Sequence, residues 1–359
     1  MQENSVKLSI IIPVYNGAET LQECVDAIVS NELTWNYEIL LVNDGSTDAS
    51  EALCKSLQSC WKERIRYVYK ENGGSLSARL RGIREARGEY LLFVDCDDIL
   101  LTQELNSAIE SITQPNASLY VFDFLYEHIE TGKIQRQQAL KNCDANRMFV
   151  GDERKPLMDA YLNGALGTMC CCLIRRDVAE KTLFLEKEKK MIVGEDRLQK
   201  MFVLICSHSI AYIPQAIYRY LLRPGSQSAP LYAAHIPNPL VLLKDFANCW
   251  GYERHNSAKL LQTDAEKLSA DLYRMRRTYK LLLDVYEDSQ HTAMTKRQLF
   301  SLACSEKVLV EIAHGLRKQG KRDLYAYFAA GILKRKSYWQ FVLFGKLVKL
   351  IRTAKHGRK

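Results

Sequence analysis

Long apolar runs are missing from this 359-residue sequence. No stretch of 18 apolar residues occurs, so we expect no transmembrane helix. Residues 1–7 contain no basic segment that leads into a long apolar one, so we expect no secretory signal peptide and a cytoplasmic protein. Because 47% of the residues are apolar and 26% are charged, the composition is that of a globular protein. The length predicts one large domain or two unequal domains.

Paired cysteine motifs are also missing, although the chain has 11 cysteines. No C-x-x-C pair occurs and the histidines are scattered, so we expect no structural zinc site. The number of cysteines is odd, and Cys170, Cys171 and Cys172 are consecutive, which is not typical of a disulfide framework. We therefore expect reduced thiols, most of which are small core residues.

The first hundred residues alternate between apolar segments and helical periodicity. We predict buried strands over 8–13, 37–42, 65–69 and 90–94, with helices over 19–30, 49–61 and 75–87 between them. This alternation predicts an α/β fold with a mostly parallel central sheet flanked by helices. Because each strand ends in a polar, glycine-containing or acidic loop, we expect the loops to meet at one edge of the sheet and to share a ligand.

The later part of the chain changes in character. We expect a strand over 119–128 with a turn at 131–133, a helix over 156–163, a short strand over 210–213, and then helices over 239–251, 263–286 and 296–318. Strand signals end near residue 230. We therefore predict a catalytic domain over 1–230, a helical C-terminal subdomain over 231–333 and a basic amphipathic tail over 334–359.

Three carboxylates directly follow the fourth predicted strand. Asp95, Asp97 and Asp98 lie within four residues, at the edge where open α/β sheets bind their ligands. At a separation of about 6 Å and an effective dielectric constant near 20, each like-charge pair costs roughly 3 kcal/mol. A divalent cation would reverse that cost, and Mg, Mn or Ca favours such oxygen-rich sites. The alternative is a solvated acidic turn before the next helix.

Four short motifs follow one another in the first hundred residues: IIPVYN at 11–16, NDGSTD at 43–48, GSLSAR at 74–79 and FVDCDD at 93–98. In this order and spacing they resemble the inverting glycosyltransferases of family 2. The resemblance continues through 194–196 and 218–226, and it covers about the first 230 residues. It implies a GT-A-type nucleotide-diphospho-sugar transferase fold with an α-helical C-terminal region, and a role in surface polysaccharide synthesis.

The resemblance implies that the first two loops hold the nucleotide of the sugar donor. Pro13, Tyr15 and Glu19 fall in the donor-binding segment, and Tyr15 is placed to stack on the base or to flank it. Asp44 matches the acid that accepts a hydrogen bond from uracil N3–H, which favours UDP donors. The alternative for Asp44 is an N-cap or Asx-turn acid, a role that Asp48 fits better.

The resemblance also implies contacts with the diphosphate and a metal. Arg79 is placed for phosphate contact, and its alternative is a solvated helix arginine. Asp95 and Asp97 match the D-x-D pattern of the family. Asp95 would touch the ribose or the donor sugar, and Asp97, with Asp95, would hold the Mn or Mg that bridges the diphosphate. Three later residues resemble a family loop that closes over the diphosphate: Arg219, Arg223 and Ser226.

An inverting transfer needs a base that takes the proton of the acceptor hydroxyl. Asp196 matches the family position of that base, and Glu195 is the second candidate. The alternative for Asp196 is an N-cap of a helix that begins at Arg197. Residues 168–173 depart from the aromatic and lysine-containing acceptor segment of many relatives, so the acceptor stays open.

Acidic residues are missing from the C-terminal tail. Nine Lys or Arg residues lie in 334–359, so the net charge of +8 belongs to this tail and the rest of the chain is close to neutral. Drawn as a helix, 338–352 has an apolar face and a basic face: Phe344, Leu347, Val348 and Ile351 against Lys346, Lys349 and Arg352. This pattern predicts an interfacial helix on the anionic, cytosolic face of a membrane. The alternative is a helix packed on the body with a solvated basic end.

These observations favour one of three functions. The leading hypothesis is a metal-dependent transfer from a nucleotide-sugar donor to a glycan or lipid-linked acceptor. We expect no nucleic-acid partner, because binding to a nucleic acid would leave the apolar face of the tail helix without a contact. The first alternative is a non-catalytic nucleotide-sugar-binding protein tethered by its tail. The second is a nucleotidyltransferase, which would need a glycine-rich, lysine-bearing signature that residues 14–17 do not supply.

Overall fold

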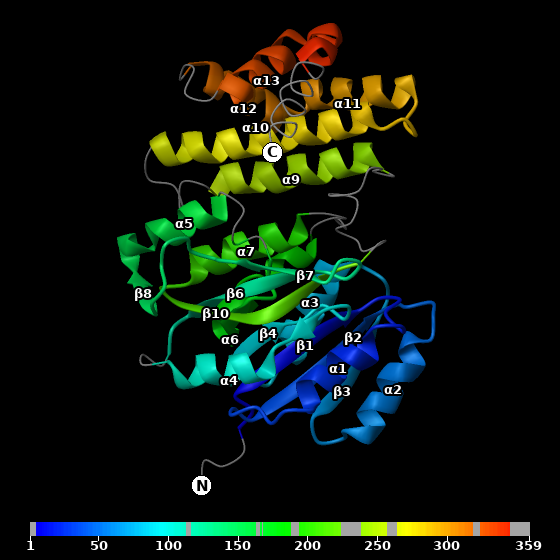
Figure 1. Cartoon of the computed structure of the whole chain (residues 1–359), viewed down its shortest axis with the longest axis vertical. Helices are drawn as coiled ribbons and strands as arrows, with labels where there is room; N and C mark the ends of the chain where they lie inside the picture. The colour runs from blue at the N-terminus through cyan, green and yellow to red at the C-terminus, as the bar shows by residue number, and fades with distance from the viewer. Residues whose placement is uncertain are drawn as a thin grey trace. The chain divides into compact units, whose positions relative to one another are not determined.

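The structure is a computed structural model that describes residues 5–112, 116–162, 166, 168–187, 194–223, 238–256, 264–318 and 324–344. The chain forms two compact units, Met1–Pro224 and Gly225–Lys359 (Figure 1). Among the helices formed by the described residues, none is both long and apolar enough to cross a membrane.

The first unit begins with the predicted alternation of strands and helices. Its elements are β1 (Leu8–Val14), α1 (Leu21–Val29), β2 (Tyr37–Asp44), α2 (Ser50–Cys60), β3 (Ile65–Lys70), α3 (Ser75–Glu85) and β4 (Tyr90–Phe93). The pairs β1 with β2, β1 with β4 and β2 with β3 are all parallel. Every residue of β2 and β4 is buried, as expected of strands covered on both faces. The α/β prediction is confirmed.

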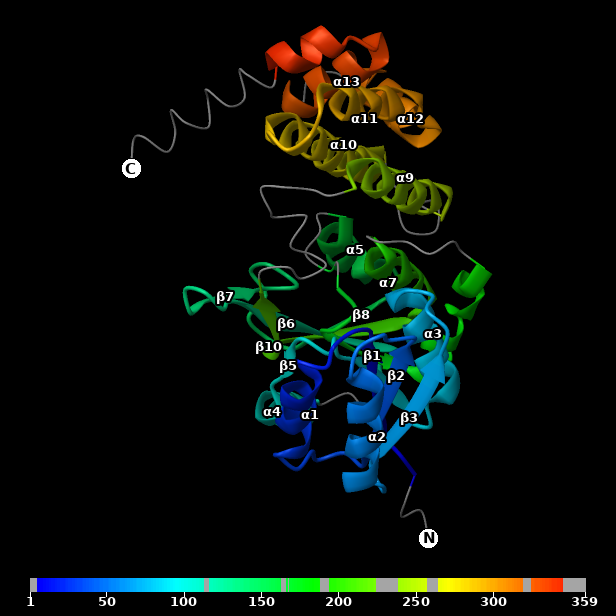
Figure 2. The same cartoon turned by 90° about the vertical axis from the view of Figure 1, so that its right-hand side faces the viewer.

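The second half of this unit extends the sheet with mixed pairing. Its elements are β5 (Ile99–Leu100), α4 (Thr102–Glu110), β6 (Leu119–His128), β7 (Lys133–Gln137), β8 (Arg147–Val150), α5 (Lys155–Leu162), β9 (Cys172–Arg175), α6 (Arg176–Glu180), α7 (Glu195–Cys206) and β10 (Ser209–Leu222), with short 3-10 helices at Gly151–Arg154 and Leu183–Lys187. The strand order is β3-β2-β1-β4-β9-β6-β10-β5, with β7 on β6 and β8 on β10. Because β9 is antiparallel to both β4 and β6, the sheet is parallel only in part. Figure 2 shows the β6–β7 hairpin projecting from the sheet.

The strand predicted over 210–213 is too short, because β10 runs from Ser209 to Leu222. Its pairing with β6 shifts in register between Ile213 and Ala216. Pro214 lies at this irregularity. Proline has no N–H to donate, and the missing hydrogen bond costs little stability where the pairing is already interrupted. The prediction stopped at the proline, whereas the chain passes it as a bulge and continues to the site.

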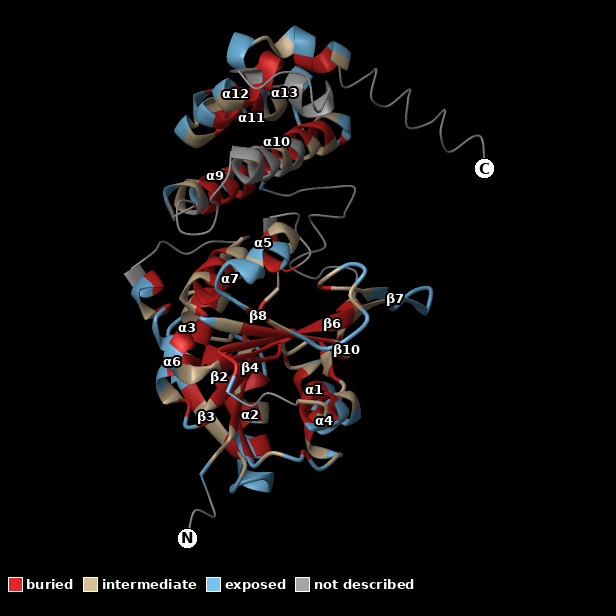
Figure 3. Cartoon of the chain, turned by 90° about the vertical axis from the view of Figure 1, so that its left-hand side faces the viewer, coloured by how far each residue is buried: buried red, intermediate tan, exposed pale blue. Residues whose placement is uncertain are grey.

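Helices cover both faces of the sheet. Figure 3 shows α3, α6 and α7 on one side and α1 and α4 on the other, with the buried strands between them. The crossovers explain this arrangement, because the chain moves one way from β1 to β3 and returns to β4 through α3. Helix α3 therefore joins α7 on the face opposite α1 and α4.

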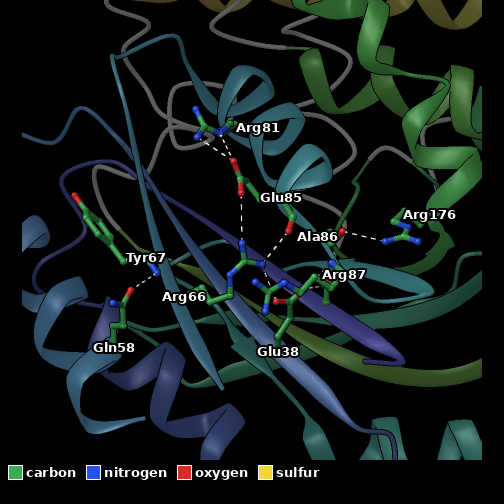
Figure 4. A network of polar contacts seen from close by, with 10 residues as sticks. Glu38, Gln58, Arg66, Tyr67, Arg81, Glu85, Ala86, Arg87 and Arg176 are labelled. Carbon is green, nitrogen blue, oxygen red and sulfur yellow. Dashed lines mark hydrogen bonds and ion pairs between the residues drawn. The ribbon is translucent and has the colours of Figure 1, made fainter. Parts of the chain in front are cut away.

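A polar network fixes the C-terminal end of α3 to the sheet (Figure 4). Glu38 of β2 is buried and accepts hydrogen bonds from Arg66 of β3 at 2.9 Å, from the Ser9 hydroxyl at 2.7 Å and from the Arg87 N–H at 2.7 Å. Arg66 also donates to the carbonyl of Glu85 at 2.9 Å. One end of α3 is thus tied down at the edge of the sheet opposite the predicted site, and its other end reaches that site.

The second unit is helical in its described part: α9 (Pro239–Asn256), α10 (Asp264–Glu287), α11 (Ala293–Ser305), α12 (Lys307–Lys318), α13 (Leu324–Arg335) and a helical segment over 338–344. Helix α10 packs against α9, α11, α12 and α13 (Figure 2). The single helix predicted over 296–318 is wrong, because Glu306 is extended, with φ −62° and ψ 118°. The break turns α12 so that Leu309, Ile312 and Leu316 are buried.

Candidate active site

The acidic turn after β4 is held from inside the fold. Asp98 is buried and accepts hydrogen bonds from the Tyr218 hydroxyl at 2.7 Å and the Leu221 N–H at 2.8 Å, both on β10. The Asp95 N–H donates to the same Tyr218 oxygen at 3.1 Å. Burial raises the pKa of Asp97 and of Asp98. The alternative of a solvated acidic turn is therefore wrong, and Asp98 serves to anchor the turn.

Arg79 lies at the centre of a cluster of acids. Its side chain, on the first turns of α3, is 1% exposed and faces Asp95 at 3.9 Å and Glu195 at 3.6 Å. It also forms an ion pair with Asp196. The alternative of a solvated helix arginine is wrong. Phosphate contact by Arg79 stays a prediction, since its charge is shared by these carboxylates.

Glu195 and Asp196 begin helix α7. Gly194, with φ 93°, is the N-cap residue, a conformation that favours glycine. The helix therefore starts two residues earlier than predicted, and the N-cap alternative for Asp196 is wrong. The Asp196 carboxylate accepts a hydrogen bond from the Met169 N–H at 3.4 Å, and Glu195 accepts one from the Ser75 hydroxyl at 2.8 Å.

The crowding of acids changes their proton affinity. Burial and the neighbouring Asp196 charge raise the pKa of Asp95 to about 7. The same two causes raise the pKa of Glu195 to about 7. Asp95 and Asp196 are far apart in the sequence, yet one guanidinium contacts both. Carboxylates held at shifted pKa values in this way are a feature of functional sites.

Asp44 is buried at the end of β2 and is fully engaged. Its carboxylate accepts hydrogen bonds from Lys70 Nζ at 2.5 Å, the Gly73 N–H at 2.9 Å and the Gly74 N–H at 2.7 Å. The role of Asp44 toward uracil stays a prediction. Lys70 was not predicted, and the signal that could have found it is its place at the end of the neighbouring strand.

The first loop presents its donor-site candidates to solvent. Tyr15 is 45% exposed, Glu19 is exposed and Pro13 is half-buried. Asn16, with φ 50°, joins this loop to the second one through its side-chain oxygen, which accepts a hydrogen bond from the Thr47 N–H at 2.8 Å. Exposed ring surface beside a fixed loop is suited to contact with a nucleobase.

Asp48 has the turn role that its sequence context favours. Its carboxylate accepts a hydrogen bond from the Ser50 N–H at 3.0 Å and another from the Ala18 N–H at 3.1 Å. Asp48 therefore closes an Asx turn at the start of α2 and holds the first loop against the second.

Of the three residues predicted to close over the diphosphate, Arg223 lies at the acidic turn. It donates to the carbonyl of Asp97 and pairs with Glu23 at 3.4 Å. Arg219 lies within β10 and pairs with Glu127 at 3.3 Å, so its assignment to a loop is wrong. Ser226 lies outside the described residues.

Residues 9–183 match the family model described as Glycosyl transferase family 2. The chain carries a family 2 glycosyltransferase domain. It is 29% identical over 231 residues to glycosyltransferase GlyA of Streptococcus pneumoniae serotype 4, and 28% identical over 226 residues to the minor teichoic acid biosynthesis protein GgaB of Bacillus subtilis. Each match covers 62% of this chain, but only 31% and 23% of the lengths of these relatives.

The fold is shared with a solved structure. The structure of S. aureus TarS 1-349 in complex with UDP-GlcNAc superimposes with a TM-score of 0.63 and 16% sequence identity. The superposition covers 97% of this chain and 92% of that one. At this identity the likeness shows the fold alone, and it extends beyond the glycosyltransferase domain into the helical unit.

Cysteines surround the acids of the glycosyltransferase domain. All 11 cysteines are free, as predicted. The Cys170 thiol donates to Asp95 at 3.4 Å, and Lys200 Nζ donates to Cys172 Sγ at 2.6 Å, with both of the latter side chains fully buried. Burial alone would raise the pKa of Cys172, but hydrogen bonds from Cys171 and Lys200 and the Lys200 charge lower it to about 6.

The contact between Lys200 and Cys172 was not predicted. Lys200 lies one helical turn after Asp196 on α7. Its contact with Cys172 of β9 therefore fixes the helix that carries the predicted base.

Two acids of the turn after β4 have the chemistry of ligands for a divalent cation. Within the described part of the chain, no three His, Cys, Asp or Glu side chains form a complete metal site. Asp97 and Asp95 are two carboxylates whose pKa is raised by burial, which a cation would reverse. Mg²⁺ is commonly bound by one or two carboxylates together with substrate phosphates.

Proposed function

We propose that this chain transfers a sugar from a UDP-sugar to a hydroxyl acceptor with inversion, and that it depends on Mn or Mg. The observation that carries the proposal is the contact of Arg79 with both Asp95 and Asp196. One buried guanidinium joins the acid of the predicted donor site to the predicted base, although the two are 101 positions apart in the sequence. This arrangement brings donor and acceptor chemistry into one site.

The donor side follows from the turn after β4. Asp97 and Asp95 hold the cation, and Arg223 steadies Asp97 through its carbonyl. The cation, when bound, neutralises the charge that develops on the leaving UDP. Asp44 and Tyr15 bind the base of the nucleotide, and Pro13 and Glu19 shape the loop around it. The TarS structure of the same fold, solved with UDP-GlcNAc, supports a UDP donor.

The acceptor side follows from the start of α7. Asp196 takes the proton of the acceptor hydroxyl as that oxygen attacks the anomeric carbon. Its ion pair with Arg79 and its hydrogen bond from Met169 fix the orientation of the carboxylate. Attack from the side opposite the leaving UDP inverts the anomeric centre. Glu195, with its raised pKa and its bond to Ser75, positions Arg79 and is the second candidate for the base.

The acceptor is a surface glycan or its lipid-linked precursor, and the enzyme acts on the cytosolic face of the membrane. The name of GgaB, a teichoic acid biosynthesis protein, supports the glycan class. The nine basic residues of 334–359 support contact with an anionic surface. Of the helix predicted over 338–352, only 338–344 is described. There Phe341 and Val342 are buried and the Phe344 ring contacts the Tyr279 ring, as the alternative of a packed helix predicts. Residues 345–352 lie outside the described part.

The test is release of UDP. The purified full-length chain is incubated with Mn and each of a panel of UDP-sugars, and free UDP is assayed with and without candidate glycan acceptors. We expect one donor to give Mn-dependent UDP release that an acceptor stimulates. UDP-sugar binding without release would support the non-catalytic alternative. Pyrophosphate release from a nucleoside triphosphate and a sugar phosphate would support the nucleotidyltransferase alternative.

A further inference from the structure

A cavity of about 480 Å³ lies in the helical unit, and none of the residues of the candidate active site lines it. Its walls come from one face of α11 and from the segment that follows α13. The lining residues include Arg297, Ser301, Ser305, Lys336, Tyr338 and Trp339. The family model ends at residue 183 and assigns this cavity no role.

The backbone at Lys336 shapes the cavity. Helix α13 ends at Arg335, and Lys336 then has φ 53°, in the left-handed region that non-glycine residues rarely adopt. The Lys336 N–H bonds to the carbonyl of Leu333 at 3.1 Å, and the chain enters the helical segment 338–344. This turn holds the Lys336 side chain at the cavity. A left-handed residue at this position is a common way for a helix to end, and here it fixes where the next segment begins.

The walls of the cavity are cationic. Arg297 and Lys336 are both exposed, and no Asp or Glu lines the cavity. The structure pairs neither cation with a carboxylate among the residues it describes. The Arg297 guanidinium lies 5.8 Å from the centre of the Tyr338 ring, and Ser301 adds a hydroxyl donor. Two cations and a hydroxyl around one cavity match the hydrogen-bonding needs of a phosphate group.

Large apolar side chains are exposed beside these cations. Trp339 is 70% exposed and Leu343, one helical turn later, is 66% exposed. Met294, 69% exposed, lies one turn before Arg297 on α11. A glycan would stack on the tryptophan ring but leave the leucine and methionine in water. A lipid surface would bury all three, and tryptophan is enriched at the level of lipid headgroups.

We infer that this cavity binds the phosphate headgroup of an anionic phospholipid, with Trp339 and Leu343 entering the membrane interface. Arg297 and Lys336 then contact the lipid phosphate, and the neighbouring Lys334 and Arg335 add attraction to the surface. The inference rests on the proposed membrane association and gives it a specific site. It does not depend on the donor or on catalysis.

The experiment measures sedimentation of the full-length chain with phosphatidylcholine vesicles that contain or lack phosphatidylglycerol. The variant Arg297→Gln/Lys336→Gln removes the two cavity cations. The control Lys62→Gln/Lys244→Gln removes two exposed cations elsewhere. We expect the cavity variant to lose about tenfold or more in apparent affinity for phosphatidylglycerol vesicles, and the control to lose less than about twofold, since each cation at the surface contributes about 1 kcal/mol. Equal losses in both variants, or none in the cavity variant, would overturn the inference.

A second readout follows Trp339 directly. Lipids brominated in their acyl chains should quench part of the tryptophan fluorescence of the bound protein, and Trp339→Phe should lack that part. Absence of quenching, or competition by a soluble phosphorylated glycan in place of vesicle binding, would show another occupant and contradict the inference. Mn-dependent UDP release by the cavity variant in solution should equal that of the wild type. If neither protein releases UDP but vesicle binding behaves as expected, the proposed function fails and the lipid site stands.

Discussion

Asp196 and Glu195 are adjacent acids that contact the same arginine but have different surroundings. Asp196 lies beside the Met169 N–H, whereas Glu195 is bonded to the Ser75 hydroxyl and has a pKa raised to about 7. A general base works best when its pKa lies near the operating pH, so the raised pKa of Glu195 does not exclude it. The assignment of Asp196 therefore rests on its match to the family position of the base, and the two acids need a direct test.

Replacing Asp196 with Asn should leave UDP-sugar binding intact and lower the transfer rate by about 10²- to 10⁴-fold, because only proton removal is lost. The rate comes from UDP release with acceptor present, and the affinity from calorimetric titration. Glu195→Gln is the matched control and should retain far more activity. An active Asp196→Asn beside an inactive Glu195→Gln would mean that the two roles are reversed.

The pair of Cys172 and Lys200 makes stability depend on pH. The folded-state pKa of Cys172 is lowered to about 6 from an ordinary value of 9.0, so its contribution is complete only above pH 9 and is lost as the pH falls through 6. Cys172→Ser keeps the shape but does not ionise. The difference in free energy of unfolding between wild type and Cys172→Ser should therefore grow from pH 6 to pH 8, by at most about 1.4 kcal/mol per pH unit.

Urea denaturation at pH 6 and pH 8 measures this difference. Cys54→Ser is the matched control, because Cys54 is also buried but burial raises its pKa to about 12. Its effect should be the same at both pH values. An equally flat difference for Cys172→Ser would show a neutral thiol and amine in place of an ion pair.

Residue patterns predicted the acids of the site but not all their partners. Asp95 and Asp97 stand out because they directly follow a buried strand, whereas Asp196 was identified only by its match to a position of the family. Lys70 and Lys200 look like ordinary strand and helix lysines, and only the folded chain places them against Asp44 and Cys172. Buried pairing of this kind depends on contacts between distant elements, which local pattern does not contain.

Helix α3 shows how one element connects the frame to the site. Its start carries Arg79, and its end is tied by the network of Glu38, Arg66 and Glu85 (Figure 4). Replacing Glu38 with Ala leaves the Ser9 hydroxyl and the Arg87 N–H without their acceptor and breaks the ion pair with Arg66. We expect the free energy of unfolding to fall by about 3 kcal/mol.

The control for this substitution is Glu89→Ala. Glu89 pairs with Lys7, but both side chains are more than a third exposed, so the loss should be below about 1 kcal/mol. Urea denaturation of both variants at one pH measures the two values. Similar losses would mean that the Glu38 network does not hold α3 in place.

The elements themselves were predictable where burial alone decides. β1, β2, β4 and β6 follow from largely apolar runs, whereas β3 is buried at only two of its six positions. The continuation of β10 past Pro214 was missed because a proline ordinarily ends a strand, and the break at Glu306 was missed because helical spacing continues across it. In both cases the packing of neighbouring elements determines the backbone conformation and overrides the local preference of the sequence.

At the scale of the whole molecule, charge and chemistry lie in different parts of the sequence. The glycosyltransferase domain is acidic, with 18 Lys or Arg against 26 Asp or Glu over residues 9–183, whereas 334–359 has nine basic residues and no acidic one. The division of the chain at residues 230 and 333 into a catalytic domain, a helical subdomain and a basic amphipathic tail stays a prediction. Deleting 345–359, which keeps the buried Phe341 and Val342 of the helical unit, should weaken binding to anionic vesicles without changing the affinity for the UDP-sugar. Loss of donor binding on this deletion would instead show that the tail supports the fold.

The central claim is that the turn after β4 holds a cation together with the nucleotide. The most direct measurement is calorimetric titration of the wild type and Asp97→Ala with the UDP-sugar that the release assay selects, with and without Mn. The account predicts that Mn strengthens donor binding to the wild type and has no such effect on Asp97→Ala, because the cation loses its protein ligand. Mn-dependent binding to Asp97→Ala at close to the wild-type affinity would contradict the account.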